Sequence, residues 1–356
     1  MGLNRAEAAA FDHLYVALAE DDDVADIFLG IGEADLFQAY VAQTLPDHAG
    51  GTFEGVSQGL RAFDHHLIDP VGPIGEEGKL RILTDFASWS ADKDRGDAAS
   101  YELSGLGFRG GAEYLSGIGA FGVTGSWIWN EHETGVANAI VSNSYEAGVH
   151  WRSKFGAIGA FARAGLGKSD FEGNRTFEGG TGDDAVSFMI DRTWSGDFVS
   201  ATGGLSLEGG SQFFFVRPSI VLDYLSLTED GYVETGGGDA LNLTVAERKS
   251  DELGANLGLA VGADLFGMQA RDRSWVRLEG EGGWRQLLSG ELGETTAHYA
   301  DGDDFILLPE QRGSGWFARI KGYGGDEFYT LGAELGAEEQ FGNIGYSFRA
   351  SLRFGW

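Results

Sequence analysis

The last thirteen residues of the chain alternate between apolar and polar side chains. The apolar positions are Ile344, Tyr346, Phe348, Ala350, Leu352, Phe354 and Trp356. The positions between them carry only Gly, Ser and Arg, with the arginines at Arg349 and Arg353. A period of two over this length predicts a β-strand with one apolar and one polar face. Aromatic residues on one face and arginines on the other are typical of a strand in a membrane-spanning barrel, where the arginines face a hydrated lumen.

The same alternation recurs along most of the chain, which favours a membrane barrel over the alternative of an edge strand in a soluble β-sandwich. From residue 80 onward we predict twelve strands, at 80–92, 100–114, 117–129, 143–153, 156–168, 197–208, 212–226, 250–264, 272–287, 314–323, 327–337 and 343–356. Most connections at one end are short, whereas those at the other end include long polar loops at 130–142, 169–196, 227–249 and 288–313. This asymmetry is expected of an outer-membrane barrel. The sequence therefore predicts an all-β fold, a twelve-stranded antiparallel transmembrane barrel.

The composition agrees with a barrel and excludes several other classes. No run of apolar residues reaches the roughly 18–20 that a membrane-spanning helix requires. The chain of 356 residues contains no cysteine, so it forms neither a disulfide nor a thiolate metal site. A net charge of −30 argues against a basic surface that binds nucleic acid. We expect no cofactor, no metal site and no nucleic-acid partner.

The first 77 residues follow a helical pattern instead. In the segment 52–68, apolar residues are spaced three and four apart, at Phe53, Val56, Leu60, Phe63 and Leu67. A helix of that length spans about 25 Å, close to the height of about 25 Å of the apolar band of such barrels. We therefore divide the chain into a helical segment, 1–77, and a barrel, 78–356. The length of the helix agrees with a position in the lumen, but its apolar stripe fits a polar lumen poorly. The alternative is packing outside the barrel or on lumen aromatics such as Phe161 and Phe317.

Charged side chains of both signs occupy the strand positions that would face the lumen. The predicted channel-lining set is Arg109, Glu113, Glu146, His150, Arg152, Arg163, Glu208, Arg217, Asp223, Arg277, Glu279, Glu281, Arg285, Arg319, Lys321, Glu334, Arg349 and Arg353. Isolated charges inside a narrow barrel are costly, so these groups must pair or stay hydrated. We expect them to hold the helix and to keep the channel hydrated for a passing chain. The alternative is that they only pair with one another across strands.

Several segments resemble the carboxyl-terminal translocator domain of type V autotransporters. The central ones are Thr228-Glu-Asp-Gly-Tyr-Val-Glu-Thr-Gly-Gly, Ala240-Leu-Asn-Leu-Thr-Val-Ala and Leu253-Gly-Ala-Asn-Leu-Gly-Leu. Residues 105–113 are similar to the second strand of that family, 347–356 to its last strand, and 39–67 to the helical linker before its barrel. The order and spacing of these segments, which together cover nearly the whole chain, carry the resemblance.

The resemblance implies a twelve-stranded outer-membrane barrel with a helix threaded through it, which exports an upstream passenger to the cell surface with the help of the barrel-assembly machinery. It further implies a monomer that contacts outer-membrane lipid and lipopolysaccharide, with its amino-terminal passenger side at the cell surface. The expected carboxyl-terminal barrel signal is Tyr346, Phe348, Leu352, Phe354 and Trp356. With no secretory signal before the helical segment, we expect the chain to be the carboxyl-terminal part of a longer precursor. Some family members cut themselves between two adjacent asparagines, a pair that this sequence lacks, so we expect the passenger to stay attached.

Two other functions compete with export. A small-solute porin plugged by its amino-terminal helix would need a lumen open to ions. An outer-membrane hydrolase would use Ser57, because Gly55-Val-Ser-Gln-Gly59 fits the G-x-S-x-G nucleophile elbow. That elbow follows a strand, whereas the apolar spacing places Ser57 within a helix. We therefore expect no catalytic residue, and we expect the protein not to be an enzyme.

Overall fold

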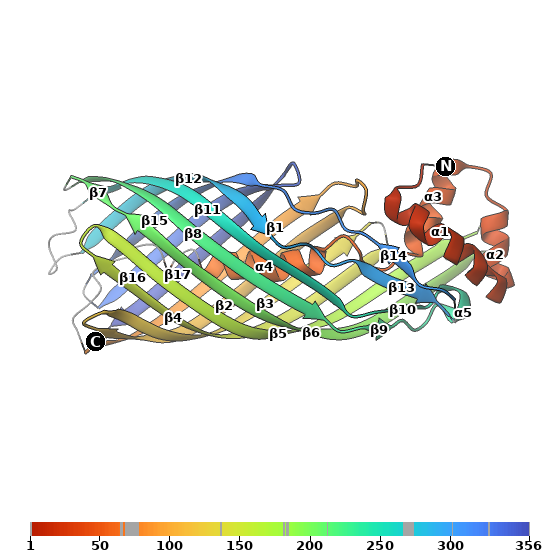
Figure 1. Ribbon diagram of the computed structural model, residues 1–356, viewed down its shortest axis with the longest axis horizontal. Helices are drawn as coiled ribbons and strands as arrows, with labels where there is room; N and C mark the ends of the chain where they lie inside the picture. The colour runs from red at the N-terminus through yellow and green to blue at the C-terminus, as the bar shows by residue number, and fades with distance from the viewer. Residues whose placement is uncertain are drawn as a thin grey trace.

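The protein is described from a computed structural model, which defines residues 2–64, 67, 78–135, 137–180, 182, 185–211, 213–265, 274–300, 302–326 and 328–355. Within these residues, twelve long antiparallel strands form one sheet (Figure 1): β1 (Leu80–Lys93), β2 (Tyr101–Ser116), β3 (Gly119–Thr134), β4 (Asn138–Phe155), β5 (Ile158–Gly179), β6 (Val186–Leu207), β8 (Phe214–Glu229), β11 (Arg248–Asp264), β12 (Trp275–Ser289), β15 (Gly315–Gly325), β16 (Tyr329–Gln340) and β17 (Asn343–Gly355). The two-residue strand β7 (Gly209–Gly210) pairs with the start of β8. The sheet closes because β17 pairs with β1, from Arg81 opposite Gly355 to Ser90 opposite Tyr346. The prediction of a closed twelve-stranded barrel is confirmed.

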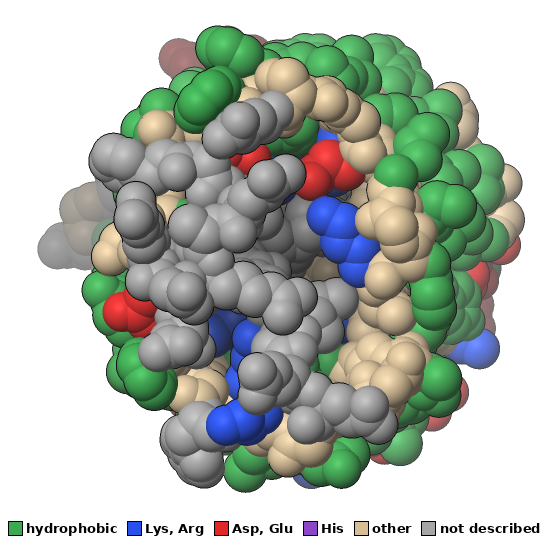
Figure 2. Space-filling model, turned by 90° about the vertical axis from the view of Figure 1, so that its left-hand side faces the viewer, with side chains coloured by type: hydrophobic (Ala, Val, Ile, Leu, Met, Phe, Trp, Pro, Cys, Tyr) green, Lys and Arg blue, Asp and Glu red, His purple; other side chains and the backbone are tan. Residues whose placement is uncertain are grey.

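The final strand shows how the alternation sorts side chains across the wall. Tyr346, Phe348 and Phe354 are 61%, 37% and 45% exposed, whereas Arg349 and Arg353 are buried. Leu352 is half-buried. Trp356 lies outside the described residues. Figure 2, which views the end where the chain terminates, shows hydrophobic side chains around the outer wall and acidic and basic side chains within the ring.

The predicted loop at 169–196 is wrong. Two strands of 22 residues each, β5 and β6, run through most of it, up to Gly179 and from Val186. Their inward side chains there are buried and include Phe171, Phe177 and the ion-paired Arg175, while the outward side chains Lys168 and Asp170 are exposed. The hairpin therefore keeps its alternation but turns its polar face outward. Outward polar side chains are typical of a loop, so the sequence predicts a loop at 169–196, although here they belong to strands that extend beyond the apolar band of the barrel.

The loops predicted at 227–249 and 288–313 also contain regular structure. They supply the strands β9 (Tyr232–Val233), β10 (Leu243–Val245), β13 (Thr295–Tyr299) and β14 (Phe305–Leu307), and the short helix α5 (Gly238–Leu241). These strands form a second sheet in the order β14-β13-β10-β9. The strands are too short for a period of two to be read from sequence alone.

Three helices lie at the same end of the barrel, with a 3-10 turn at Leu18–Glu20 (Figure 1): α1 (Arg5–Ala17), which packs on β13 and β14, α2 (Asp22–Leu29), and α3 (Ala34–Gln43), which packs on β5. Asn4 and Glu7 form a capping box at the start of α1, and Asp21 caps α2. One apolar cluster joins Leu14, Val24 and Val41 of the helices to Leu243 and Tyr299 of the sheet. We call α1–α3, α5 and the second sheet the cap, and the opposite end of the barrel the turn end.

The remaining helix, α4 (Gly51–Asp64), lies inside the barrel (Figure 1). It covers most of the helix predicted at 52–68. Beyond Asp64, only Leu67 of that segment is described. The described residues contain no helix with the length and hydropathy needed to cross a membrane.

Candidate functional site: the helix-filled lumen

α4 lies against the inner wall of the barrel through a face made of glycine. It carries glycine at three positions four residues apart: Gly51, Gly55 and Gly59. A Cβ atom at these positions would lie 2.7 Å from His132, 2.9 Å from Asn130 and 2.9 Å from the ring of Trp89, respectively. Four helical residues rise about 6 Å, nearly the advance of two residues along a strand. Gly59 also lies over Ile128 of β3, whose Cγ2 atom would be 3.0 Å from such a Cβ atom. The three glycines therefore follow the successive inward side chains His132, Asn130 and Ile128 of β3, and the helix backbone can approach the wall directly.

The apolar stripe of α4 packs on apolar side chains that project into the lumen. Phe53, Val56, Leu60 and Phe63 are all buried. Their partners from the strands are Ala87, Trp89, Ile128, Ile140, Phe171, Trp194, Phe198, Leu225 and Leu227. The helix therefore packs inside the barrel, on a lumen that is apolar over part of its wall.

Of the two aromatics suggested as lumen partners, one contacts this segment. Phe161 packs with Leu67 and Val221. Phe317 instead lies beside Arg319, whose guanidinium carbon is 4.3 Å from the ring centre.

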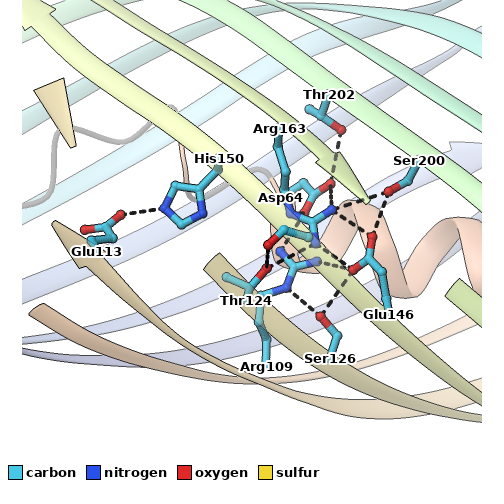
Figure 3. A network of polar contacts seen from close by, with 11 residues as sticks. Asp64, Arg109, Glu113, Thr124, Ser126, Glu146, His150, Arg163, Ser200 and Thr202 are labelled. Atoms are coloured by element: carbon cyan, nitrogen blue, oxygen red, sulfur yellow. Dashed lines mark hydrogen bonds and ion pairs between the residues drawn. The ribbon is translucent and has the colours of Figure 1, made fainter. Parts of the chain in front are cut away.

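Two buried arginines hold the last residue of α4 (Figure 3). The carboxylate of Asp64 lies 2.5 Å from Arg109 Nη1 and 3.4 Å from Arg163 Nη1, and it accepts a hydrogen bond from the Thr202 hydroxyl at 3.1 Å. Glu146 pairs with the same two arginines, at 2.6 Å from Arg163 Nη2 and 3.3 Å from Arg109 Nη2. The guanidinium of Arg109 also lies over the ring of Phe63, 4.8 Å from its centre. Two cations and two carboxylates, nearly out of contact with solvent, therefore fix the end of the helix.

A second ionic group surrounds the middle of α4. Arg61 lies 3.3 Å from Glu54 on the same helix and 3.2 Å from Glu338 of β16. Arg312, from the segment between β14 and β15, forms ion pairs with Glu54 and, at 2.6 Å, with Glu252 of β11. The polar face of α4 is therefore paired to the barrel wall on more than one side.

The start of α4 is held at the cap end. Thr52 donates to Glu229 at 3.0 Å and accepts from Arg248, which itself pairs with Glu229 at 2.9 Å. Arg248 also lies 3.5 Å from Asp47 in the turn before the helix. Burial alone would raise the pKa of Asp47, but a hydrogen bond and the charges of His132 and Arg248 outweigh it and hold that pKa well below its ordinary value. Asp47 therefore stays ionised as an anchor ahead of the helix.

Seventeen of the eighteen predicted lumen residues are buried, and Glu208, just beyond the end of β6, is half-buried. Arg109 and Arg163 contact α4 directly, through Asp64. Asp223 pairs with Arg285 at 3.0 Å, and Arg285 pairs with Glu252 at 2.5 Å.

Toward the turn end, the predicted residues pair mainly with one another. Short pairs link Glu113 with Arg152 at 2.7 Å, Arg277 with Glu208 at 2.9 Å, Arg217 with Glu279 at 2.7 Å, Lys321 with Glu281 at 2.8 Å and Arg349 with Glu334 at 2.9 Å. His150 Nε2 lies 2.8 Å from Glu113 (Figure 3), Arg319 lies 3.7 Å from Glu281, and Arg353 is buried beside Arg349 and Arg152. The lumen thus contains both groups that hold the helix and groups that pair across the strands.

Sequence reasoning missed several residues that contact α4. Glu252 lies on the inward parity of β11, which Asp264 shares, so the alternation could have identified it. Arg248 and Arg312 were read as parts of loops. Arg312 follows no periodic pattern, because it comes from an irregular segment that reaches into the barrel.

The motif considered for catalysis has a structural role. Ser57 lies within α4, where its hydroxyl accepts from Arg61 at 2.5 Å and from Arg312 at 3.4 Å. The G-x-S-x-G match reflects the glycine face of the helix. Among the described residues, no group of three or more His, Asp or Glu side chains is arranged to hold a metal ion.

The geometry defines a class of protein: a transmembrane β-barrel whose lumen is filled by a helix from its own amino-terminal segment. The sequence matches the family described as Autotransporter beta-domain over residues 84–321. The chain belongs to this family, and it is an outer-membrane translocator barrel. Membership implies a linked upstream passenger.

Solved structures show the same fold. The translocator domain of the autotransporter NalP from Neisseria meningitidis superposes with a TM-score of 0.60 at 14% identity, covering 86% of this chain and 96% of that one. The transport unit of the autotransporter AIDA-I from Escherichia coli gives a TM-score of 0.50 at 13% identity, covering 87% of this chain and 99% of that one. A comparison with curated protein sequences finds no match.

Proposed function

We propose that the barrel passes its upstream passenger through the lumen to the cell surface and then retains α4 as a plug that anchors the passenger. The observation that carries the proposal is the path of the chain. The cap lies at one end of the barrel, α4 occupies the lumen, and β1 begins at the turn end (Figure 1). A segment ahead of α1 would thus emerge at the cap end, which we assign to the cell surface.

The role as a plug is supported by how α4 is held. Its apolar stripe is fully buried against the lumen, and its polar residues pair with Arg109, Arg163, Glu252 and Glu338. Burial of charges that are paired and hydrogen-bonded favours one defined position of the helix. The lumen groups that pair across strands would keep the wall hydrated while an extended chain passes.

We further propose that the protein acts without catalysis, as a monomer in contact with outer-membrane lipid and lipopolysaccharide, and that the barrel-assembly machinery inserts it. The exposed apolar wall supports the contact with lipid, and the buried position of Ser57 gives no support to hydrolysis. The passenger would stay attached, because the described part of α4 contains no asparagine.

Conductance in planar bilayers tests the plug against the alternative of a small-solute porin. The chain without residues 2–64 should conduct ions steadily, whereas the full chain should stay mostly closed. Equal conductance of the two would overturn the plug. Export is tested separately by an epitope placed ahead of α1 in cells, which should be reached by antibody on intact cells; an epitope reached only after lysis would contradict the proposed direction.

A further inference from the structure

The segment 308–312 lies between β14 of the cap and β15 of the barrel, and its residues bond to several different parts of the molecule. We call it the strap. It has no regular secondary structure. It nevertheless makes contacts with α1, with the β1–β2 loop, with the β12–β13 loop and with α4. Such a set of contacts from five successive residues links parts that are otherwise far apart in the sequence.

The first two residues of the strap hold the cap. Arg5, the first residue of α1, donates to the carbonyl oxygen of Leu308 at 3.0 Å and to that of Pro309 at 3.4 Å. The same end of α1 is tied to the β1–β2 loop, because Arg95 pairs with Glu7 at 2.9 Å. These contacts form only when residues 2–45 sit at the cap end.

The next two residues tie the strap to neighbouring loops. Glu310 pairs with Lys93 at 2.5 Å and accepts from the backbone N–H of Asp97 at 2.5 Å. Gln311 accepts from the backbone N–H of Leu292 at 2.9 Å and donates to its carbonyl at 3.2 Å. Leu292 in turn packs beside Gly50, where a Cβ atom would lie 2.9 Å from its Cδ1. The strap therefore also fixes the residue that abuts the chain just ahead of α4.

The last residue of the strap reaches the helix. Arg312 is buried, forms ion pairs with Glu54 of α4 and with Glu252, and donates to Ser57 at 3.4 Å. Its guanidinium carbon lies 5.1 Å from the centre of the Phe53 ring. If the strap moved away, the buried carboxylate of Glu54 would lose one of its cations, which is costly in a site that excludes water.

We propose that the strap is a lock that couples the docking of the cap to the retention of α4, with Arg312 as the positioning residue. α1 holds the strap from outside, the strap holds α4 from within, and the barrel is sealed only after residues 2–45 have emerged and folded onto the second sheet. The inference rests on the proposed role of α4 as a plug. It adds that α4 is fixed in the lumen as the last step, when the docked α1 holds the strap in the position in which Arg312 pairs with Glu54.

The test compares channel openings of full-length variants in planar bilayers. Arg312→Gln removes the lock, and Arg277→Gln is the control, because Arg277 is also buried and paired but lies toward the turn end, bound to Asp264 and Glu208. The double variant Arg5→Ala with Glu7→Gln loosens the cap from outside without touching the lumen. We expect Arg312→Gln to open at least tenfold more often than Arg277→Gln, and the cap variant to open more often than the unchanged chain.

The decisive arm combines the cap variant with Arg312→Gln. If the strap carries the coupling, the cap substitutions add no further opening once Arg312 is replaced. Opening of Arg312→Gln no more frequent than that of Arg277→Gln, or effects that simply multiply in the combined variant, would overturn the lock. Failure of the plug itself would be seen separately, as a chain without residues 2–64 that conducts no better than the full chain.

Discussion

Asp64→Asn is the substitution that most sharply tests how α4 is held. Asp64 is 2% exposed and supplies the carboxylate between Arg109 and Arg163. Asparagine keeps the size of the side chain but removes the charge. Removal of one partner from a buried ion pair costs about 3–5 kcal/mol. A carboxylate in the last turn also interacts unfavourably with the helix dipole. Its removal therefore stabilises the helix by about 0.3–1 kcal/mol, which is smaller than the loss from the ion pairs.

The net loss of a few kcal/mol should appear as easier local opening of the helix. A factor of ten corresponds to about 1.4 kcal/mol, so amide hydrogens of residues 51–64 should exchange roughly two to three orders of magnitude faster in Asp64→Asn. Hydrogen exchange measured by mass spectrometry on the protein in detergent micelles reports these amides directly. The control is Asp170→Asn, because Asp170 is exposed on β5 beside Lys168. Exchange within twofold of the unchanged chain, or an equal acceleration by Asp170→Asn, would refute the ionic grip on the helix.

Three further outcomes follow from the packing and from one titrating group. Gly59→Val should shift α4 off the wall, because a Cβ atom there already meets the rigid ring of Trp89 at 2.9 Å; overpacking costs about 1–3 kcal/mol, and faster exchange of residues 51–64 than in the exposed control Gly32→Val checks it. Leu335 lies on the outward face of β16. Leu335→Lys should make the free energy of folding into lipid vesicles less favourable by up to about 2–4 kcal/mol, the cost of a Lys near the bilayer midplane, whereas Leu335→Met should leave it unchanged. Burial lowers the pKa of His48, which is neutral and 3% exposed in the turn ahead of α4. The stability it contributes is therefore complete above the unfolded pKa of about 6.5 and is lost as the pH falls below it. Proteolysis of residues 2–45 should be faster at pH 5.5 than at pH 7.5, and His48→Gln should remove most of that difference.

The barrel could be predicted from sequence because its wall imposes a rule on every second residue. Arg349 and Arg353 face inward and Tyr346 and Phe348 outward because lipid and lumen differ so strongly. The same rule placed the inward charges of the other strands. The alternation also predicts which residues of a strand face α4. On β1, the charged residues Asp85 and Lys93 lie on the same inward face as Trp89, which contacts the helix.

The rest could not be predicted because it depends on contacts between segments far apart in the chain. The apolar patch that receives Phe53 and Phe63 is built from single residues of several strands, such as Ile128, Phe171 and Phe198. Each of these looks ordinary within its own strand. The strands of the second sheet are too short for a period of two to be read, and Arg312 reaches the lumen from a segment without regular structure.

The claim that supports the whole account is that α4 lies against β3 inside a membrane barrel, and cysteine cross-linking tests it most directly. The chain has no cysteine of its own, so Gly55→Cys can be combined with Asn130→Cys, which faces the helix, or with Trp129→Cys on the opposite face of the same strand. In outer membranes treated with an oxidant, the account predicts a disulfide for the pair 55 and 130 and none for the pair 55 and 129. Failure of the first pair to cross-link in protein that has inserted as a barrel, or equal cross-linking of both pairs, would contradict it.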